Sequence, residues 1–263
     1  MIGIDHLSPR SVGGVTIAQC VALIAPLAVV ATADPERFAL NLVAALVAAL
    51  VWEGIFATLR RRVLSFHGVT TAFIVAVVLP PEIAIWQIVF AVSLGVILGE
   101  LVFGGRGFGF VQPAAVALSL LLISFPELQL RQSTTALAVA TVPGAVLLLL
   151  MGLISWRVLV GAIIASAVLL ALRGAEMEPV TVATAMAFAL VFLVCDPISA
   201  AATPIGRWIY GALAGGLVIV FSPPGAPTAE AMVFAALMSG VFAPLIDHVV
   251  ILIHARREMR RHA

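Results

Sequence analysis

The stretch "VCDPISAAATPIGRWIYG", residues 194–211, places an acid, two prolines and a base between two apolar runs. Pro197 disfavours helical geometry at the residue before it. A hydroxyl group of Ser199 or Thr203 can cap a following helix that has Pro204 in its first turn. The free amides at the start of such a helix can also face an anion. The segment predicts either a capped loop or a polar ligand site formed by Asp196, Ser199, Thr203, Arg207 and Trp208.

A second polar stretch, "FGGRGFGFVQPAA" at residues 103–115, is rich in glycine and aromatic residues. Its glycines permit close approach of the backbone to a ligand, and its phenylalanines can stack on a flat ring. Its glutamine supplies both donors and an acceptor. No strand precedes it, which excludes a dinucleotide-binding fingerprint. The residues of interest are Gly104, Gly105, Arg106, Phe108, Gly109, Phe110 and Gln112.

Three carboxylates fall inside or beside apolar runs, where a charge is costly and therefore informative. We expect Glu53 and Glu100 to reach the membrane interface or to pair with the arginines at 60–62 and 106. Asp247, in "FAPLIDHVV", lies deeper and is the best sequence candidate for a buried ionisable group. Asp247 and Glu100 are therefore predicted to belong to an ion pathway, unless each merely pairs with an arginine.

The composition requires these residues to be positioned by a membrane protein. The 263-residue chain is 63% hydrophobic and 10% charged, with a mean hydropathy of +1.20. Helices satisfy the backbone in lipid, and the apolar runs do not alternate as barrel strands do. The two cysteines lack a metal-binding or disulfide spacing. The sequence predicts an all-α polytopic protein with no soluble domain and no nucleic-acid partner.

Ten apolar segments account for almost the whole chain, although the third, fifth and seventh are short for a full crossing. They lie at 13–33, 37–58, 68–80, 83–103, 111–126, 136–153, 157–172, 179–195, 206–222 and 229–252. All 14 basic residues are arginine. With a cytoplasmic N-terminus, eleven arginines fall on the inner side and three on the outer side. This bias predicts ten crossings with both termini cytoplasmic.

Ten crossings divide into two halves of five, at about 13–126 and 136–252, within a single transmembrane domain of residues 1–263. The remaining ends, 1–12 and 253–263, are predicted to be short cytoplasmic tails. The third segment begins "GVTTAFIVAVVLPPE" and the eighth "PVTVATAMAFALVFLVCDP". An odd number of crossings per half makes the halves inverted relative to each other, so broken helices can meet and form a site.

The blocks "VVLPPEIAIWQ", "VFGGRGFGFVQPA", "MGLISWR", "DPISAAATPIGRWIYG" and "FAPLIDHVV" resemble the RnfD/NqrB family. That family comprises membrane subunits of the Rnf complex and of the sodium-pumping NADH:quinone oxidoreductase. The resemblance implies ten helices in two inverted halves. It also implies membrane and peripheral partner subunits, a bacterial cytoplasmic membrane, and electron transfer coupled to Na⁺ or H⁺ movement.

The resemblance also implies cofactors. Family members carry FMN linked through its phosphate to a threonine, and NqrB-type members hold riboflavin and work next to quinone. The matching place here is "QLRQSTTAL", in which Thr135 would be the attachment residue. Gln129 stands where the family motif has aspartate, and Ser133 and Thr134 replace Gly-Ala. The hydroxyl cluster is equally explained as a helix cap.

Three functions follow as hypotheses. The first is a flavin-holding or quinone-contacting subunit of an electron-transport complex, not catalytic alone. The second is a flavin-free scaffold or anchor of another membrane redox complex, since the attachment motif has changed. The third is a small-solute or ion channel or transporter, a role that inverted halves and broken segments also suit.

Overall fold

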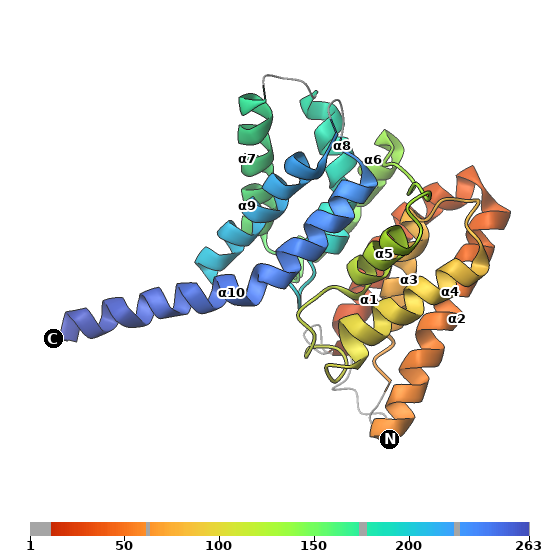
Figure 1. Cartoon of the computed structure of the whole chain (residues 1–263), viewed down its shortest axis with the longest axis horizontal. Helices are drawn as coiled ribbons and strands as arrows, with labels where there is room; N and C mark the ends of the chain where they lie inside the picture. Colours follow the sequence, from red (N-terminus) through yellow and green to blue (C-terminus); the bar gives the residue numbers. More distant parts are fainter. Residues whose placement is uncertain (1–11, 62–63, 174–177, 224–226, 263) are drawn as a thin grey trace.

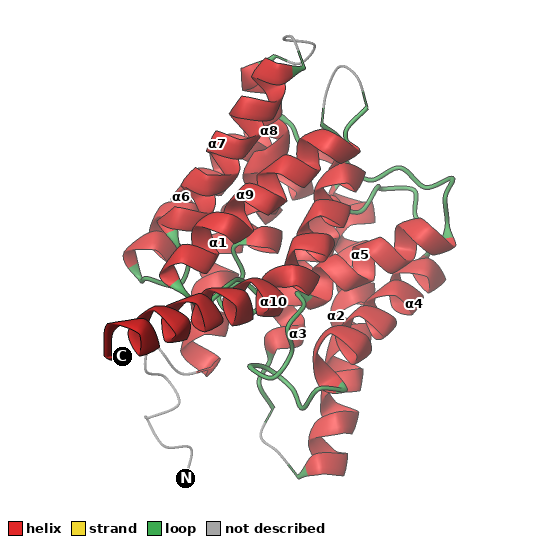
Figure 2. Cartoon of the chain, turned by 60° about the vertical axis from the view of Figure 1, so that its left-hand side comes forward, coloured by secondary structure: helices red, strands yellow, loops and turns green. Residues whose placement is uncertain are grey.

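The computed structural model of the chain describes residues 12–61, 64–173, 178–223 and 227–262 (Figure 1). Across these ranges the chain is helical and contains no β-strand, which confirms the predicted class for this part of the chain (Figure 2). The ten α-helices are α1 (Val12–Ala33), α2 (Pro35–Arg60), α3 (His67–Val78), α4 (Ile85–Val96), α5 (Pro113–Ser124), α6 (Thr135–Leu150), α7 (Trp156–Leu172), α8 (Pro179–Ala189), α9 (Pro204–Phe221) and α10 (Ala229–His262).

Four helices are long and apolar enough to cross a membrane, namely those at Gly13–Ala33, Pro35–Arg60, Pro204–Phe221 and Ala229–Arg256. The others are apolar but shorter, between 10 and 17 residues. Many large apolar side chains on the outside of the bundle are exposed. An apolar exterior of this extent is expected of a protein whose solvent is lipid.

Proline and hydroxyl or amide side chains set the starts of several helices. Thr203 accepts a hydrogen bond from the amide of Gly206, and Pro204 occupies the first turn of α9, as the sequence predicts. Gln112 caps α5 in the same way, with Pro113 following it. Because a cap and a proline supply or remove the unpaired N–H groups, these helices begin at fixed residues.

Small residues allow the second-half helices to pack closely. A Cβ atom added to Gly211 would collide with the carbonyl of Val158, and one added to Gly215 would collide with that of Ala162. The α7 and α9 backbones therefore touch, as in other membrane helix pairs with small residues at their contact. Figure 1 shows α2 to α5 gathered on one side and α7 to α9 on the other, with α1 packed on α6 and α5 on α10 between them.

Two of the shorter helices end in π-helical turns. Helix α4 continues as η2 (Ile97–Leu101), and α8 continues as η3 (Leu190–Val194). Wider turns of this kind are rare and often mark functional sites. Here η2 carries Glu100 and leads to the glycine-rich loop, while η3 leads to Asp196. The two irregular helix ends therefore deliver both polar stretches identified in the sequence.

Candidate functional site

The glycine-rich loop after η2 turns Arg106 into the interior of the protein. Gly105 and Gly107, on either side of it, have φ angles of 94° and 98°, in the left-handed region that favours glycine. Arg106 is 9% exposed, although it lies in a loop that the composition made look like a surface turn. The role of these glycines is conformational, since they permit the turns that direct the arginine inward.

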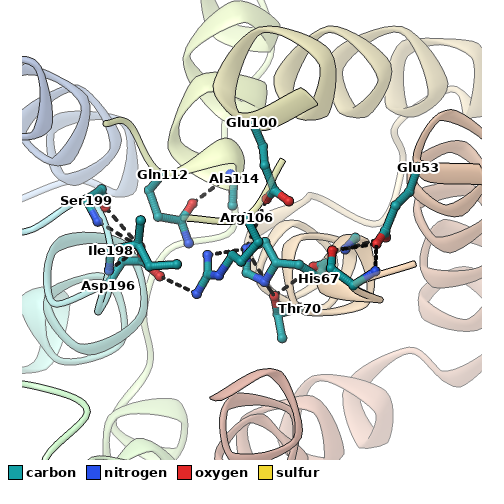
Figure 3. Close-up of polar contacts among 12 residues, drawn as sticks. Glu53, His67, Thr70, Glu100, Arg106, Gln112, Ala114, Asp196, Ile198 and Ser199 are labelled. Atoms are coloured by element: carbon teal, nitrogen blue, oxygen red, sulfur yellow. Dashed lines mark hydrogen bonds and ion pairs between the residues drawn. The ribbon is translucent and has the colours of Figure 1, made fainter. Parts of the chain in front are cut away.

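The guanidinium group of Arg106 joins three separate parts of the chain (Figure 3). Its Nη1 atom lies 2.5 Å from Nε2 of His67, at the start of α3. Its Nη2 atom donates to Oε1 of Gln19 on α1 at 3.1 Å, and to Oδ1 of Asp196 at 3.2 Å. We call the set formed by Gln19, His67, Thr70, Glu100, Arg106, Asp196 and Ser199 the buried polar cluster.

Asp196 is the anionic centre of the cluster and is 2% exposed. Its Oδ2 atom accepts hydrogen bonds at 3.1 Å from the amides of Ile198 and Ser199 and from the Ser199 hydroxyl group. Burial by itself raises the pKa of this carboxyl group. The positive charge of Arg106 and the two amides outweigh burial and lower the pKa below its ordinary value. Asp196 is therefore an ionised partner that also shapes the segment after η3.

His67 and Glu100 complete the cluster on its other side. The Nδ1 atom of His67 lies 2.6 Å from the hydroxyl oxygen of Thr70. The Nε2 atom of His67 lies 3.5 Å from Oε2 of Glu100. His67 is 1% exposed and Glu100 6% exposed, so both groups are held away from solvent. The expected pairing of Glu100 with an arginine is replaced by contact with a histidine.

Glu53 differs from its expected role as well. It is buried, and it accepts hydrogen bonds from the Ser65 amide at 2.8 Å, the Ser65 hydroxyl at 2.6 Å and the Gly68 amide at 3.1 Å. The carboxylate thus satisfies amides at the beginning of α3, where the helix dipole also favours a negative charge. Arg60 instead donates to the carbonyl of Leu101 at 2.6 Å, at the end of η2.

The expectation that Asp247 is deeply buried is wrong, because the residue is only half-buried. It accepts hydrogen bonds from the Ala202 amide at 2.7 Å, the Thr203 amide at 3.0 Å and the Thr203 hydroxyl at 2.6 Å. These bonds tie α10 to the residues just before α9. Asp247 occupies a capping position here, separate from the buried polar cluster.

The predicted residues of the two polar stretches therefore divide between different surroundings. Gln112 is buried and donates to the carbonyl of Phe192 at 3.2 Å, while Arg207 donates to the carbonyl of Ala201 at 3.2 Å. Phe110 packs edge-on against Phe103, and Trp208 against Trp156. Phe108 is exposed, and Gly104 and Gly109 are half-buried in the loop. Arg106, Gln112, Asp196 and Ser199 lie in the interior, whereas Thr203 and Arg207 belong to the start of α9.

Thr135 lies at the first position of α6 and is exposed, while the neighbouring Thr134 caps the helix by accepting from the Leu137 amide at 3.3 Å. The predicted cap is therefore confirmed for Thr134. Ala138, one turn below Thr135, lines an apolar groove of about 490 Å³ between α6, α7 and α8. The groove is also lined by Val142, Ile163, Ala167, Val182, Met186 and Leu190, among others.

Sequence reasoning missed Gln19, His67 and Thr70. Gln19 is an amide in the middle of the first apolar run and His67 opens the third, so each carried the signal of a polar group inside a span. Their partners lie 87 and 39 residues away along the chain. A single sequence gives no local pattern that connects positions so far apart.

Similarity to known proteins relates the chain to one family. The family model described as the NQR2, RnfD, RnfE family matches residues 6–136 and 129–254, which together make up nearly the whole chain. The chain belongs to this family. The resemblance seen in the sequence blocks is thereby confirmed, and with the apolar helices it identifies a membrane protein.

Curated relatives of this NQR2/RnfD/RnfE family member are named as the NqrB subunit of the Na(+)-translocating NADH-quinone reductase. The protein from Ectopseudomonas mendocina (strain ymp) is 29% identical over 80% of this chain, and the one from Azotobacter vinelandii is 28% identical over the same share. The chain spans 66% of the length of each of these relatives. They are, by name, subunits of a redox complex that moves sodium ions.

Proposed function

We propose that the chain is a membrane subunit of an electron-transport complex that works with quinone and couples electron transfer to the movement of Na⁺ or H⁺. The observation that carries the proposal is the family match over both ends of the chain, together with relatives named as a subunit of a quinone reductase. The partners would be other integral and peripheral subunits in a bacterial cytoplasmic membrane. Catalysis would require the whole complex.

Contacts between loops support ten alternating crossings with both termini cytoplasmic. The loops predicted to be cytoplasmic contact one another, since Arg106 reaches the start of α3 and the segment after η3. The loops predicted to be outside also meet. There, the Arg131 amide donates to the Val78 carbonyl at 2.9 Å, and Gln132 donates to Glu230 at 3.2 Å. Such grouping is expected if each helix reverses the direction of the chain, and we propose two inverted halves on this basis.

The surroundings of Thr135 fit an FMN bound through its phosphate. The hydroxyl-bearing side chain is exposed at the start of α6, where the helix dipole favours a phosphate group. The groove beginning at Ala138 lies on the same face of the helix, three residues further on, and offers an apolar surface for a ring. When bound, FMN would supply a carrier that accepts and donates electrons. The chain itself would attach, orient and shield it.

The predicted inner pocket does not fit a second, non-covalent flavin in the same way. Gln112 bonds to the backbone at Phe192 and Ala114, and Arg106 bonds to Asp196. The groups expected to recognise a ring are therefore used by one another. This pairing favours, as a second candidate function, a scaffold subunit that has no riboflavin and possesses FMN only if Thr135 is modified.

The test is mass spectrometry of the protein purified from its native membrane. An intact mass raised by one FMN, and restored to the unmodified value in Thr135→Ala, supports the electron-transfer role. The matched control is Ser133→Ala, which removes a nearby hydroxyl and should retain the flavin. An unmodified wild-type mass, with quinone reduction by the membranes unaffected when the chain is deleted, would reject it. Solute flux through the isolated chain in proteoliposomes would instead indicate a transporter.

A further inference from the structure

One nitrogen atom in the buried polar cluster is approached by two charged side chains. His67 Nε2 lies 2.5 Å from Nη1 of Arg106 and 3.5 Å from Oε2 of Glu100. A guanidinium group can only donate, so Nε2 must accept and the ring proton must be on Nδ1. Thr70 agrees with this assignment. Its hydroxyl donates to the His67 carbonyl at 2.8 Å and so is free to accept from Nδ1 at 2.6 Å.

The charges around this nitrogen require an additional proton. Arg106 and Asp196 balance each other as an ion pair. With His67 neutral, an ionised Glu100 would leave one negative charge unpaired at a site that is 6% exposed. A buried charge without a partner is strongly unfavourable, and the group takes up a proton instead.

Other elements packed around the cluster do not supply the missing positive charge. Glu53 on α2 is negative and already accepts from the amides of Ser65 and Gly68. Arg60, at the end of α2, is committed to the carbonyl groups of Leu101 and Val102. Gln19 on α1 is uncharged.

We propose that His67 and Glu100 form a buried proton-binding site that holds one exchangeable proton. In the arrangement seen, the proton is on Glu100 and Nε2 accepts from Arg106. Transfer breaks the O–H bond of Glu100 and forms an N–H bond at Nε2 of His67. It leaves a carboxylate beside an imidazolium, with the total charge unchanged.

The transfer changes the partners of Arg106. Once Nε2 carries a proton it can no longer accept from Nη1, and the imidazolium repels the guanidinium group. Arg106 then depends on Asp196 and Gln19 alone. A separate observation agrees with a guanidinium that can re-pair, because its buried Nε atom has no hydrogen-bond partner. The site thus couples proton position at α3 to the link between the loop after η2 and the segment after η3.

Proton binding needs no flavin or partner subunit, so the isolated chain in lipid bilayers is suitable for the test. Infrared spectra at neutral pH should show a protonated-carboxyl C=O band that is lost in Glu100→Gln and retained in Asp247→Asn. In His67→Gln the band should remain, but its exchange with deuterium should slow by about tenfold or more, because the acceptor has gone. Nitrogen-15 NMR of histidine-labelled protein should show His67 as the Nδ1–H tautomer.

A wild-type spectrum without a band assignable to Glu100 would overturn the proposal. Unchanged deuterium exchange in a folded His67→Gln protein would do the same. Where either variant fails to fold, the wild-type NMR spectrum decides, because a neutral Nε2–H tautomer at His67 is incompatible with the acceptor role. These results are independent of whether Thr135 carries FMN.

Discussion

Arg106 and Asp196 form a buried ion pair, with Nη2 and Oδ1 3.2 Å apart, between residues 90 positions apart in the sequence. Arg106 follows η2 and Asp196 follows η3, so the pair joins the irregular ends of one helix from each half. Each partner also holds backbone or side-chain groups of its own surroundings. The connection between the halves at this point therefore depends on two charges that need each other.

Removing one charge of this pair should destabilise the fold. Asp196→Asn leaves the guanidinium of Arg106 without a counter-ion, and we expect a loss of about 3 kcal/mol or more in the free energy of unfolding. The matched control is Asp34→Asn, at the start of α2, where asparagine caps nearly as well as aspartate. Chemical unfolding in detergent measures both, and equal effects in the two variants would contradict the prediction.

The same pair predicts a pH dependence. The folded protein lowers the pKa of Asp196 to about 2 from an ordinary value of 3.8. A depressed folded pKa stabilises above the unfolded value, so this stability is complete above 3.8 and is lost as the pH falls towards 2. The steepness of acid unfolding over that range should decrease in Asp196→Asn. Identical acid unfolding curves would show that Asp196 is not held ionised.

Asp247 should act on stability through the start of α9. Asp247→Ala removes the acceptor of the Ala202 and Thr203 amides, and we expect a loss of about 1–2 kcal/mol. His248, its exposed neighbour, is the control, since His248→Ala should change stability by less than about 0.5 kcal/mol. Thermal unfolding in detergent compares them. A wild-type midpoint for Asp247→Ala would exclude the capping role.

Two adjacent glycines on α9 provide a direct test of the α7–α9 contact. A Cβ at Gly215 collides with the carbonyl of Ala162, whereas one at Gly216 meets only the end of the Leu169 side chain at 3.5 Å. We expect Gly215→Ala to destabilise by about 1–3 kcal/mol. Gly216→Ala should be neutral or slightly stabilising, because alanine favours a helix over glycine. Similar unfolding midpoints for the two variants would show that the helices are not in close contact.

The helical pattern was predictable because lipid leaves the backbone few alternatives. Apolar runs of suitable length fixed the number and order of helices, and proline next to a hydroxyl or amide side chain located the starts of α5 and α9. Both signals are local, since each depends on residues within a few positions of one another. The same local reasoning correctly marked the stretches around Arg106 and Asp196 as unusual.

The sequence by itself determined a membrane-embedded all-helical chain, the positions of its helices and the two polar stretches between them. Only the tertiary structure decided that Arg106 pairs with Asp196, that His67 and Gln19 join them, and that Asp247 caps α9 instead of lying buried. The physical reason is range. Helix formation follows from neighbouring residues, whereas the partner of a buried charge is selected by how distant helices pack, and one sequence does not encode that proximity in any local pattern.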